Sequence, residues 1–139
     1  MTISYHNTRE FTPVALEELF LSVQWDSGRH PGRLAEAVHH YGAVFSAWDG
    51  ERLVGLAASM DDGTMTAYVH YLLVHPRYQG HGIGSRLLDL CKKHYAGYLS
   101  VVLTSYREGV PFYERNGFIP DRTQEAMRFI PPSPGESLL

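Results

Sequence analysis

The sequence has a single cysteine, Cys91, so it cannot form an internal disulfide and does not belong with the small disulfide-stapled proteins. It has no apolar run as long as the roughly 18 residues that a membrane-spanning helix needs. The N-terminal stretch MTISYHNTRE lacks the basic-then-apolar pattern of a secretion signal. We therefore expect a cytoplasmic protein with no membrane partner.

Excess basic charge and metal-binding motifs are also missing. With 12 lysines and arginines against 15 acidic residues, the formal net charge is −3, so we expect no nucleic-acid partner. The eight histidines include the adjacent pair His39-His40, whose side chains should point apart, and no His-Glu-x-x-His motif or cysteine pair occurs. We predict no metal site. Cys91 falls on the apolar face of a predicted helix, which favours a core residue over a nucleophile.

The size and composition of the chain fit one globular domain. The chain has 139 residues, of which 44% are hydrophobic, enough for a single core. Its end, PPSPGESLL, is rich in proline. We predict one domain over residues 1–131 and a flexible tail at 132–139.

Apolar periodicity and turn signals predict an order of elements that runs β-α-α-β-β-β-α-β-α-β-β. Thr12 and Pro13 have the residue types of a helix N-cap and first turn, and Asp49-Gly50 is a hairpin signal. Strands are predicted at 2–6, 43–48, 52–60, 66–74, 99–104, 118–119 and 127–130, and helices from about 12, from about 31, at 83–95 and at 108–115.

The most informative stretch covers residues 66–95. A strand at 66–74 is followed by Pro76, by a loop in which Gly80, Gly82 and Gly84 alternate, and by an amphipathic helix. Glycines permit positive φ and close approach of a ligand, and the first turn of a helix offers unpaired N–H groups. The stretch therefore predicts a phosphate site, although a glycine-rich turn without a ligand would give the same pattern.

Two common phosphate motifs do not fit this loop. No Gly-Lys-Ser/Thr closes it, as a Walker loop requires. The dinucleotide fingerprint needs two residues between its second and third glycines, whereas Gly82 and Gly84 are separated by one.

The loop resembles the signature of the GCN5-related N-acetyltransferases (GNAT), Gln/Arg-x-x-Gly-x-Gly/Ala, which Gln79-Gly80-His81-Gly82-Ile83-Gly84 matches position by position. The preceding Leu72-x-Val74-x-Pro76 also fits the strand and turn of that family. The resemblance implies acetyl-CoA as co-substrate, with the loop on its pyrophosphate and a bulged strand along its pantetheine arm. The cofactor-binding residues that it implies are Leu72, Leu73, Val74, Gln79, Gly80, His81, Gly82, Ile83, Gly84 and Ser85.

The same resemblance implies the fold. We expect an α/β (α+β) chain with a single mixed, mostly antiparallel sheet of about six to seven strands, helices on both faces, and a splay between the central strands. The predicted order of elements agrees with that fold from end to end.

A second stretch, Tyr113-Glu114-Arg115-Asn116-Gly117-Phe118, is similar to the family pattern Tyr-Glu-x-x-Gly-Phe. The resemblance implies that Tyr113 is the general acid that protonates the departing thiolate. A phenol with a pKa near 10 suits that task. A tyrosine that only packs on an amphipathic helix remains the alternative.

The strand Tyr68-x-His70-x-Leu72-x-Val74-His75 resembles that of the arylalkylamine (serotonin) N-acetyltransferase branch, with Tyr68 in place of that branch's first histidine. The resemblance implies that His70, assisted by Tyr68, passes the amine proton to water. By alternation, Tyr68, His70, Leu72 and Val74 should share one face of the sheet. A histidine that is merely hydrogen-bonded in a half-buried strand is the alternative.

Three residues are assigned to the acceptor. Trp25 and Asp26 lie between the first two helices, where many members of the family form the acceptor pocket, and could stack on an aromatic amine and pair with its charge. Tyr71 lies on the central strand. A buried tryptophan with a helix-capping aspartate explains Trp25-Asp26 equally well.

The function that the resemblance implies is acetyl-CoA-dependent N-acetylation of a small primary amine, for example an arylalkylamine, by direct attack in a ternary complex. The protein would act as a monomer or a homodimer. The alternatives are acetylation of a protein or peptide amine, and a non-catalytic module that binds acetyl-CoA and regulates a partner.

Overall fold

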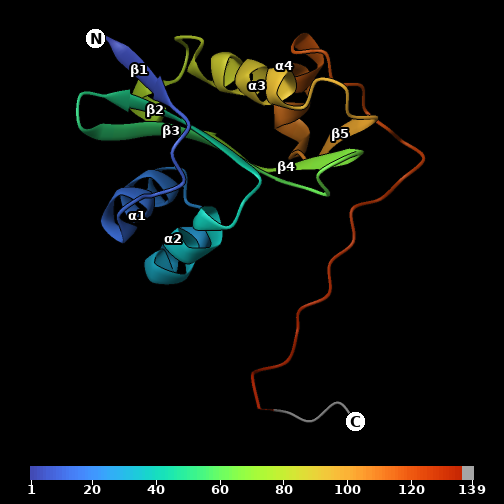
Figure 1. Cartoon of the computed structure of the whole chain (residues 1–139), viewed down its shortest axis with the longest axis horizontal. Coiled ribbons are helices and arrows are strands. Elements are labelled where there is room, and N and C mark those ends of the chain that lie inside the picture. Colours follow the sequence, from blue (N-terminus) through green and yellow to red (C-terminus); the bar gives the residue numbers. More distant parts are fainter. Residues whose placement is uncertain (136–139) are drawn as a thin grey trace. The chain divides into compact units, whose positions relative to one another are not determined.

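The computed structural model describes residues 1–135 (Figure 1). The chain divides into two compact units, Met1–Thr104 and a second one from Ser105 onward. The first unit contains the sheet and the helices that cover it, and the second is built around one short helix. The strands of the first unit are β1 (Ile3–His6), β2 (Ala43–Asp49), β3 (Arg52–Asp61), β4 (Thr66–Val74) and β5 (Ser100–Leu103).

The described residues form one five-stranded sheet in the order β1-β2-β3-β4-β5. The first four strands are antiparallel neighbours, and β5 pairs with β4 in parallel. The parallel step follows because α3 (Ile83–His94) returns the chain between β4 and β5. This mixed α/β architecture with helices on both faces confirms the predicted fold class, with fewer strands than predicted.

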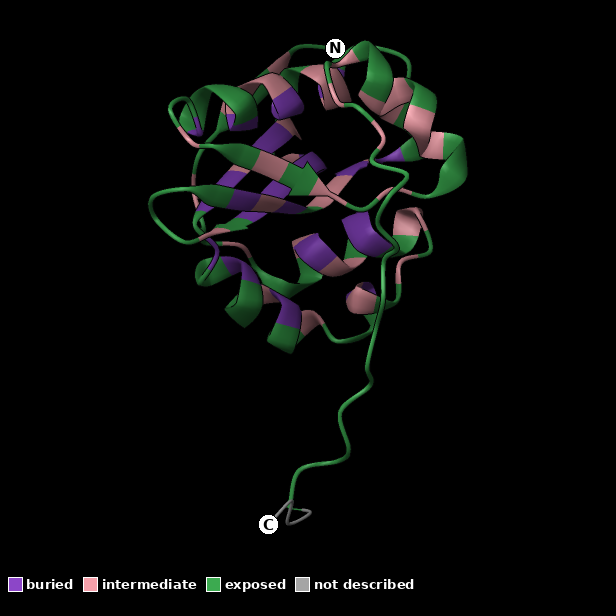
Figure 2. Cartoon of the chain, turned by 90° about the vertical axis from the view of Figure 1, so that its right-hand side faces the viewer, coloured by how far each residue is buried: buried purple, intermediate pink, exposed green. Residues whose placement is uncertain are grey.

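The two faces of the sheet are covered by different helices (Figure 1). The helices α1 (Pro13–Ser22) and α2 (Pro31–His39) bury Leu16, Phe20 and Val38 against one face, in the α1/α2 cluster. On the other face, α3 buries Ile83, Leu87 and Cys91 in the α3 cluster. Figure 2 shows the resulting pattern of buried and exposed stripes on the helices.

Local signals account for the helix ends. The Thr12 hydroxyl accepts a hydrogen bond from the Ala15 N–H at 3.2 Å, so the predicted N-cap of α1 is confirmed. Short 3₁₀ turns lie at η1 (Asp26–Arg29) and at η2 (Pro76–Tyr78). The apolar face predicted for α3 is also confirmed, with Tyr95 buried just past its end.

The second unit contains η3 (Arg107–Gly109) and α4 (Val110–Arg115). Gly117 has φ of +90°, and the Phe118 N–H donates to the Tyr113 carbonyl, which is a common pattern at the C-terminal end of a helix.

The strands predicted at 118–119 and 127–130 are wrong, because neither segment forms a strand in the described residues. Ile119, Met127 and Phe129 are each more than 80% exposed. A proline follows directly at 120 and at 131, and proline cannot donate to a ladder. An apolar pattern alone does not make a strand where no neighbouring strand pairs with it.

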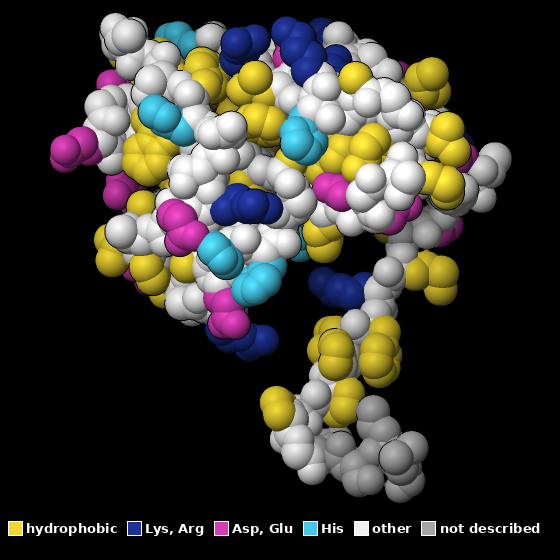
Figure 3. Space-filling view, in the orientation of Figure 1, with side chains coloured by type: hydrophobic (Ala, Val, Ile, Leu, Met, Phe, Trp, Pro, Cys, Tyr) yellow, Lys and Arg dark blue, Asp and Glu magenta, His cyan; other side chains and the backbone are white. Residues whose placement is uncertain are grey.

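Two further expectations concern a membrane-spanning helix and the C-terminal tail. No helix in residues 1–135 is both long and apolar enough to cross a membrane. Of the tail predicted at 132–139, the part from 136 on lies outside the described residues. On the face drawn in Figure 3, acidic and basic side chains are interspersed.

Candidate active site

A β-bulge interrupts β4 at His70. In the pairing with β3, Tyr71 lies opposite Ala58 and Val69 lies opposite Ser59, so His70 is an extra residue without a partner on β3. Such an insertion bends the strand and moves the following side chains to the other face.

The bulge changes which side chains of β4 lie on the same face of the sheet. Tyr71 and Leu73 pack with the α1/α2 cluster, whereas Leu72 and Val74 pack with the α3 cluster. The His70 ring stacks on that of Tyr71 with centroids 4.1 Å apart, so His70 shares the α1/α2 face. The prediction that His70 and Tyr68 share a face with Leu72 and Val74 is therefore wrong, because one inserted residue shifts the alternation.

Beyond the bulge, β4 has an open edge. The parallel register joins Thr66–Val69 of β4 to Ser100–Leu103 of β5 and goes no further. From His70 to Val74, within the described residues, no strand pairs with β4 on that side. Main-chain N–H and C=O groups along this edge can bind an extended ligand as a further strand would.

The open edge leads into the glycine loop. Gly80 and Gly82 have φ of +83° and +80°, and Gly82 is the N-cap of α3. A Cβ added at either glycine would meet no atom within 4 Å, so the loop faces open space. The first N–H groups of α3, from Ile83 to Ser85, point out of the helix end, where an anion is favoured.

The loop residues differ in what they offer a ligand. The Ile83 side chain is buried in the α3 cluster, so only its main chain is available at the helix end, whereas His81 is exposed. The Gln79 side-chain amide donates to the Val74 carbonyl at 2.9 Å, and the Gln79 N–H donates to the Pro76 carbonyl at 3.4 Å. Gln79 thus braces the loop against the end of β4.

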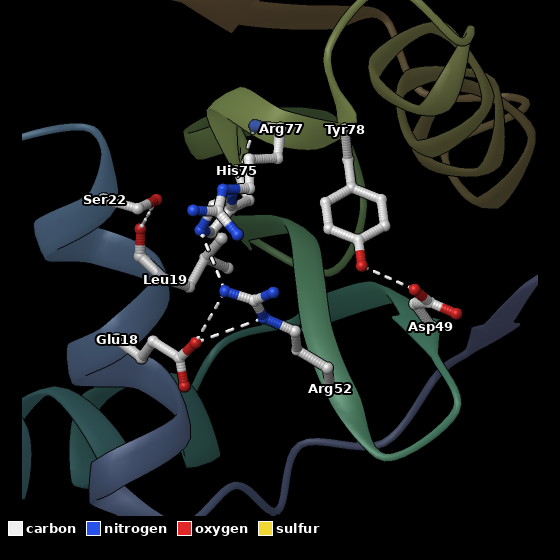
Figure 4. A network of polar contacts seen from close by, with 8 residues as sticks. All are labelled: Glu18, Leu19, Ser22, Asp49, Arg52, His75, Arg77 and Tyr78. Carbon is white, nitrogen blue, oxygen red and sulfur yellow. Dashed lines mark hydrogen bonds and ion pairs between the residues drawn. The ribbon is translucent and has the colours of Figure 1, made fainter. Parts of the chain in front are cut away.

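A polar network holds the turn between β4 and the loop (Figure 4). The Arg52 guanidinium lies between the Glu18 carboxylate, at 3.0 Å, and His75 Nε2, at 3.2 Å. The Arg77 N–H donates to His75 Nδ1 at 3.1 Å. Burial and the positive charges of Arg52 and Arg77 lower the pKa of His75, which keeps this histidine neutral. Sequence reasoning did not find this network.

Aromatic side chains gather on the α1/α2 face beside the bulge. The Tyr71 ring lies 4.9 Å from that of Phe20 and 6.1 Å from those of Trp25 and Tyr41. The Tyr41 hydroxyl lies 2.5 Å from His70 Nδ1. Desolvation lowers the pKa of His70, so the imidazole is neutral at physiological pH, although the residue stays accessible to solvent.

The predicted acceptor residues come together only in part. Trp25 and Tyr71 are both partly buried members of the α1/α2 cluster. Asp26 is exposed and lies 3.6 Å from Arg29 on the same short turn. Asp26 therefore has a local partner and is solvated.

The predicted catalytic residues lie on different parts of the chain. The Tyr68 ring lies 5.8 Å from that of His70, and its hydroxyl donates to Thr104 Oγ1 at 3.4 Å. Tyr113 belongs to α4 in the second unit, where its ring lies 6.0 Å from that of Phe118. Burial raises the pKa of Tyr113.

Sequence reasoning missed Tyr41 and Ser27 as partners of the site. The contact between Tyr41 and His70 joins residues far apart in sequence, so no local pattern indicates it. Within residues 1–135, no group of three or more His, Cys, Asp or Glu residues is placed to hold a metal ion. Cys91 is fully buried, and burial raises its pKa to about 11, so it is no nucleophile.

The chain is similar to known acetyltransferases. Residues 40–120 match the model of the acetyltransferase (GNAT) domain. An uncharacterised ycf52-like N-acetyltransferase of Prochlorococcus marinus is 28% identical over 123 residues, which cover 84% of this chain and 68% of the relative. The glucosamine 6-phosphate N-acetyltransferase of Trypanosoma brucei brucei is 35% identical over 83 residues, covering 54% of this chain and 56% of that protein.

A solved structure agrees with these relatives. A GNAT-family acetyltransferase from Streptococcus pneumoniae TIGR4 superimposes with a TM-score of 0.79 at 26% identity, over 96% of this chain and 99% of that one. Proteins with this fold use acetyl-CoA as co-substrate. The domain model, the relatives and the fold lead to one conclusion: the chain belongs to the acetyltransferase (GNAT) family and is an acyltransferase.

Proposed function

We propose that the chain transfers the acetyl group of acetyl-CoA to the primary amine of a small molecule, by direct attack in a ternary complex. The observation that carries this proposal is the open edge of β4, which begins at the His70 bulge and ends at the glycine loop. An extended thioester along such an edge would have its diphosphate at the helix end and its acyl group near the bulge.

The residues present fit acetyl-CoA. Gly80 and Gly82 leave open space in front of the loop, and the N–H groups of Gly84 and Ser85 belong to the first turn of α3. Leu73 is buried, so it and its neighbours Leu72 and Val74 would contribute their main chain. When bound, acetyl-CoA supplies the activated acyl group.

The amine must lose a proton to attack, and we assign the acceptance of that proton to His70. His70 is neutral and solvent-accessible, and it lies at the start of the open edge. We assign Tyr68, next to His70, a supporting role in passing that proton to water. Tyr113 is assigned the protonation of the thiolate, because burial keeps its phenol protonated.

The acceptor that the site favours carries an aromatic group. Trp25 and Tyr71 present ring surface on the face of the sheet that also holds His70. Asp26, solvated and close to Arg29, is assigned at most a weak attraction for an ammonium group. One relative is named for glucosamine 6-phosphate, so an amino sugar phosphate is the second candidate acceptor.

A coenzyme-release assay with purified protein, acetyl-CoA and a panel of amines tests this proposal. The panel contains arylalkylamines, glucosamine 6-phosphate, aliphatic polyamines and short peptides with free N-termini. We expect the highest kcat/KM with an arylalkylamine. A preference for peptides would instead favour a protein acetyltransferase, and binding of acetyl-CoA without turnover of any amine would favour a regulatory module.

A further inference from the structure

Four polar side chains lie in a row that ends at His70. The Ser27 and Tyr71 hydroxyl oxygens lie 2.7 Å apart, and the Tyr41 hydroxyl lies 2.5 Å from His70 Nδ1. The Tyr41 and Tyr71 rings are stacked with their centroids 6.1 Å apart, which brings the two phenols next to each other. The four side chains therefore lie in the order Ser27, Tyr71, Tyr41, His70, all within the first unit.

Tyr41 is held firmly at its place in this chain. It is only 8% exposed and belongs to the α1/α2 cluster. Its N–H donates to the Val38 carbonyl at 3.2 Å, and its own carbonyl accepts from Arg9 Nη1 at 3.0 Å. A phenol fixed by its ring and its main chain can set the orientation of the imidazole that it contacts.

The bulge is what brings His70 to this phenol. Because His70 is the inserted residue, it lies on the same face as its neighbour Tyr71, and their rings stack at 4.1 Å. In a regular strand these adjacent residues would point to opposite faces.

The hydrogen bonds along these side chains can point in either of two directions. The directions differ in which imidazole nitrogen of His70 keeps a free lone pair. If the Tyr41 hydroxyl donates to Nδ1, neutral His70 carries its hydrogen on Nε2 and has no free lone pair there. If Nδ1–H donates to the Tyr41 oxygen, Tyr41 donates to Tyr71 and Tyr71 donates to Ser27, and the Nε2 lone pair is free. Only the second direction leaves Nε2 able to take a proton from an amine.

We propose that Tyr41 is a positioning residue that holds His70 in the Nδ1–H tautomer, with Tyr71 and Ser27 continuing the chain of donors, so that Nε2 is the proton-accepting atom. The choice between the two directions rests on the proposed function, which requires a free lone pair on Nε2. The amine nitrogen loses its proton to Nε2, and the resulting imidazolium keeps its Nδ1–H bond to the Tyr41 oxygen. Because burial also raises the pKa of Tyr41, the phenol stays protonated and can go on donating to Tyr71.

The other groups around His70 do not compete for Nδ1. Among residues 1–135, the titratable side chains that face His70 are the phenols of Tyr41, Tyr68 and Tyr71. The Tyr68 hydroxyl donates to Thr104, and that of Tyr71 is within reach of Ser27. Tyr41 is thus the phenol in direct contact with the ring nitrogen.

The tautomer can be measured in the free protein, without any acetyl transfer. Long-range ¹H–¹⁵N spectra of protein labelled at histidine, recorded above the pKa of His70, show which ring nitrogen carries the hydrogen, and His70→Gln assigns the signal. We expect Nδ1–H in the wild type and its loss in Tyr41→Phe. The matched control is Tyr95→Phe, which removes the hydroxyl of another buried tyrosine, bonded to Asp61 on the other face, and should keep Nδ1–H.

Two results would overturn the proposal: Nε2–H in the wild type, or Nδ1–H that persists in Tyr41→Phe. Circular dichroism establishes that the Tyr41→Phe variant is folded. Ser27→Ala gives a second, milder test, because it leaves the Tyr41 side chain unchanged. A catalytic readout separates this proposal from the proposed function. Tyr41→Phe should lower kcat at every pH above the acidic limb of the pH profile and leave the affinity for acetyl-CoA unchanged. An unchanged kcat would also overturn this proposal. Wild-type protein that turns over no amine would contradict the proposed function alone.

Discussion

The side-chain amide of Gln79 donates a hydrogen bond to the main-chain carbonyl of Val74, 2.9 Å away. This bond ties the glycine loop to the last residue of β4. The two parts of the candidate acetyl-CoA site, the open edge and the loop, are therefore coupled by a direct contact. A change in either part should be measurable as a change in the affinity for acetyl-CoA.

Gly82→Glu should abolish binding of acetyl-CoA, because it places a carboxylate where the diphosphate is expected. Any residue other than glycine at φ of +80° also costs roughly 1–2 kcal/mol of folding free energy. Gly97→Glu is the matched control, since Gly97 has φ of +90°, is equally open, and lies beyond the far end of α3. Isothermal calorimetry should find no binding by Gly82→Glu and normal binding by Gly97→Glu. Normal binding by both would rule out the loop assignment.

Tyr113→Phe should lower kcat by about 10²-fold, within the range for loss of a general acid, and leave the dissociation constant of acetyl-CoA nearly unchanged. The ring remains, so contacts such as that with Phe118 are kept. Steady-state kinetics and calorimetry on the same preparation separate the two effects. Tyr106→Phe, at an exposed tyrosine of the same unit, is the control. If kcat is equal in Tyr113→Phe and the wild type, Tyr113 only packs.

His70→Gln should remove the acidic limb of the pH dependence of kcat/KM. Desolvation lowers the pKa of His70, so in the wild type this limb should lie below the ordinary value of about 6.5. Activity falls there because the protonated imidazole cannot accept a second proton. A pH series with a good acceptor amine measures the limb. An unchanged limb in His70→Gln would place the base elsewhere.

The stability of the fold should fall in mild acid because of His75. The pKa of His75 is lowered in the folded chain, so between its folded and unfolded values the unfolded chain binds more protons. The free energy of unfolding therefore decreases as the pH falls below about 6.5, and it gains nothing above that value. His70 acts in the same direction, so His75→Gln should reduce the slope without abolishing it.

Urea unfolding between pH 7.5 and pH 5 measures this slope. The window stays above the range in which Asp62 and Asp121, whose pKa values are lowered, would begin to protonate. If the free energy of unfolding depends on pH equally in His75→Gln and the wild type, His75 is not held neutral in the folded protein.

Gln24→Gly should stabilise the protein by roughly 0.5–1 kcal/mol, because Gln24 has φ of +62° and glycine relieves that strain. Part of the gain is lost to the greater freedom of glycine in the unfolded chain. The bond from the Trp25 N–H to the Phe20 carbonyl, 3.0 Å, should persist. Gln24→Ala keeps the strain and should not stabilise. The urea midpoints of the two variants decide the matter, and a lower midpoint for Gln24→Gly would show that the Gln24 side chain contributes more than its backbone costs.

Features that depend on neighbours in sequence could be predicted. The Thr12 cap, the β4 boundaries, the glycine loop and the apolar face of α3 all follow from short-range rules, and the structure confirms each of them. The glycine signature also indicated the family, because positive φ at Gly80 and Gly82 leaves a local mark in the sequence.

Features that depend on contacts between residues far apart in sequence could not be predicted. The bulge at His70 is set by the register between β3 and β4, and a one-residue insertion looks like ordinary alternation in the sequence. The contact between Tyr41 and His70 requires α2 and β4 to be packed together. The strand predicted at 127–130 fails for the same reason, because a strand depends on a partner that the pattern does not contain.

The most direct test of the account is a titration of ¹⁵N-labelled protein with acetyl-CoA, followed by backbone amide NMR. The account predicts that the largest shifts fall on the amides of residues 80–85 and 71–74, the glycine loop and the open edge of β4. Saturable shifts confined to other parts of the chain, or no shifts at all, would contradict it.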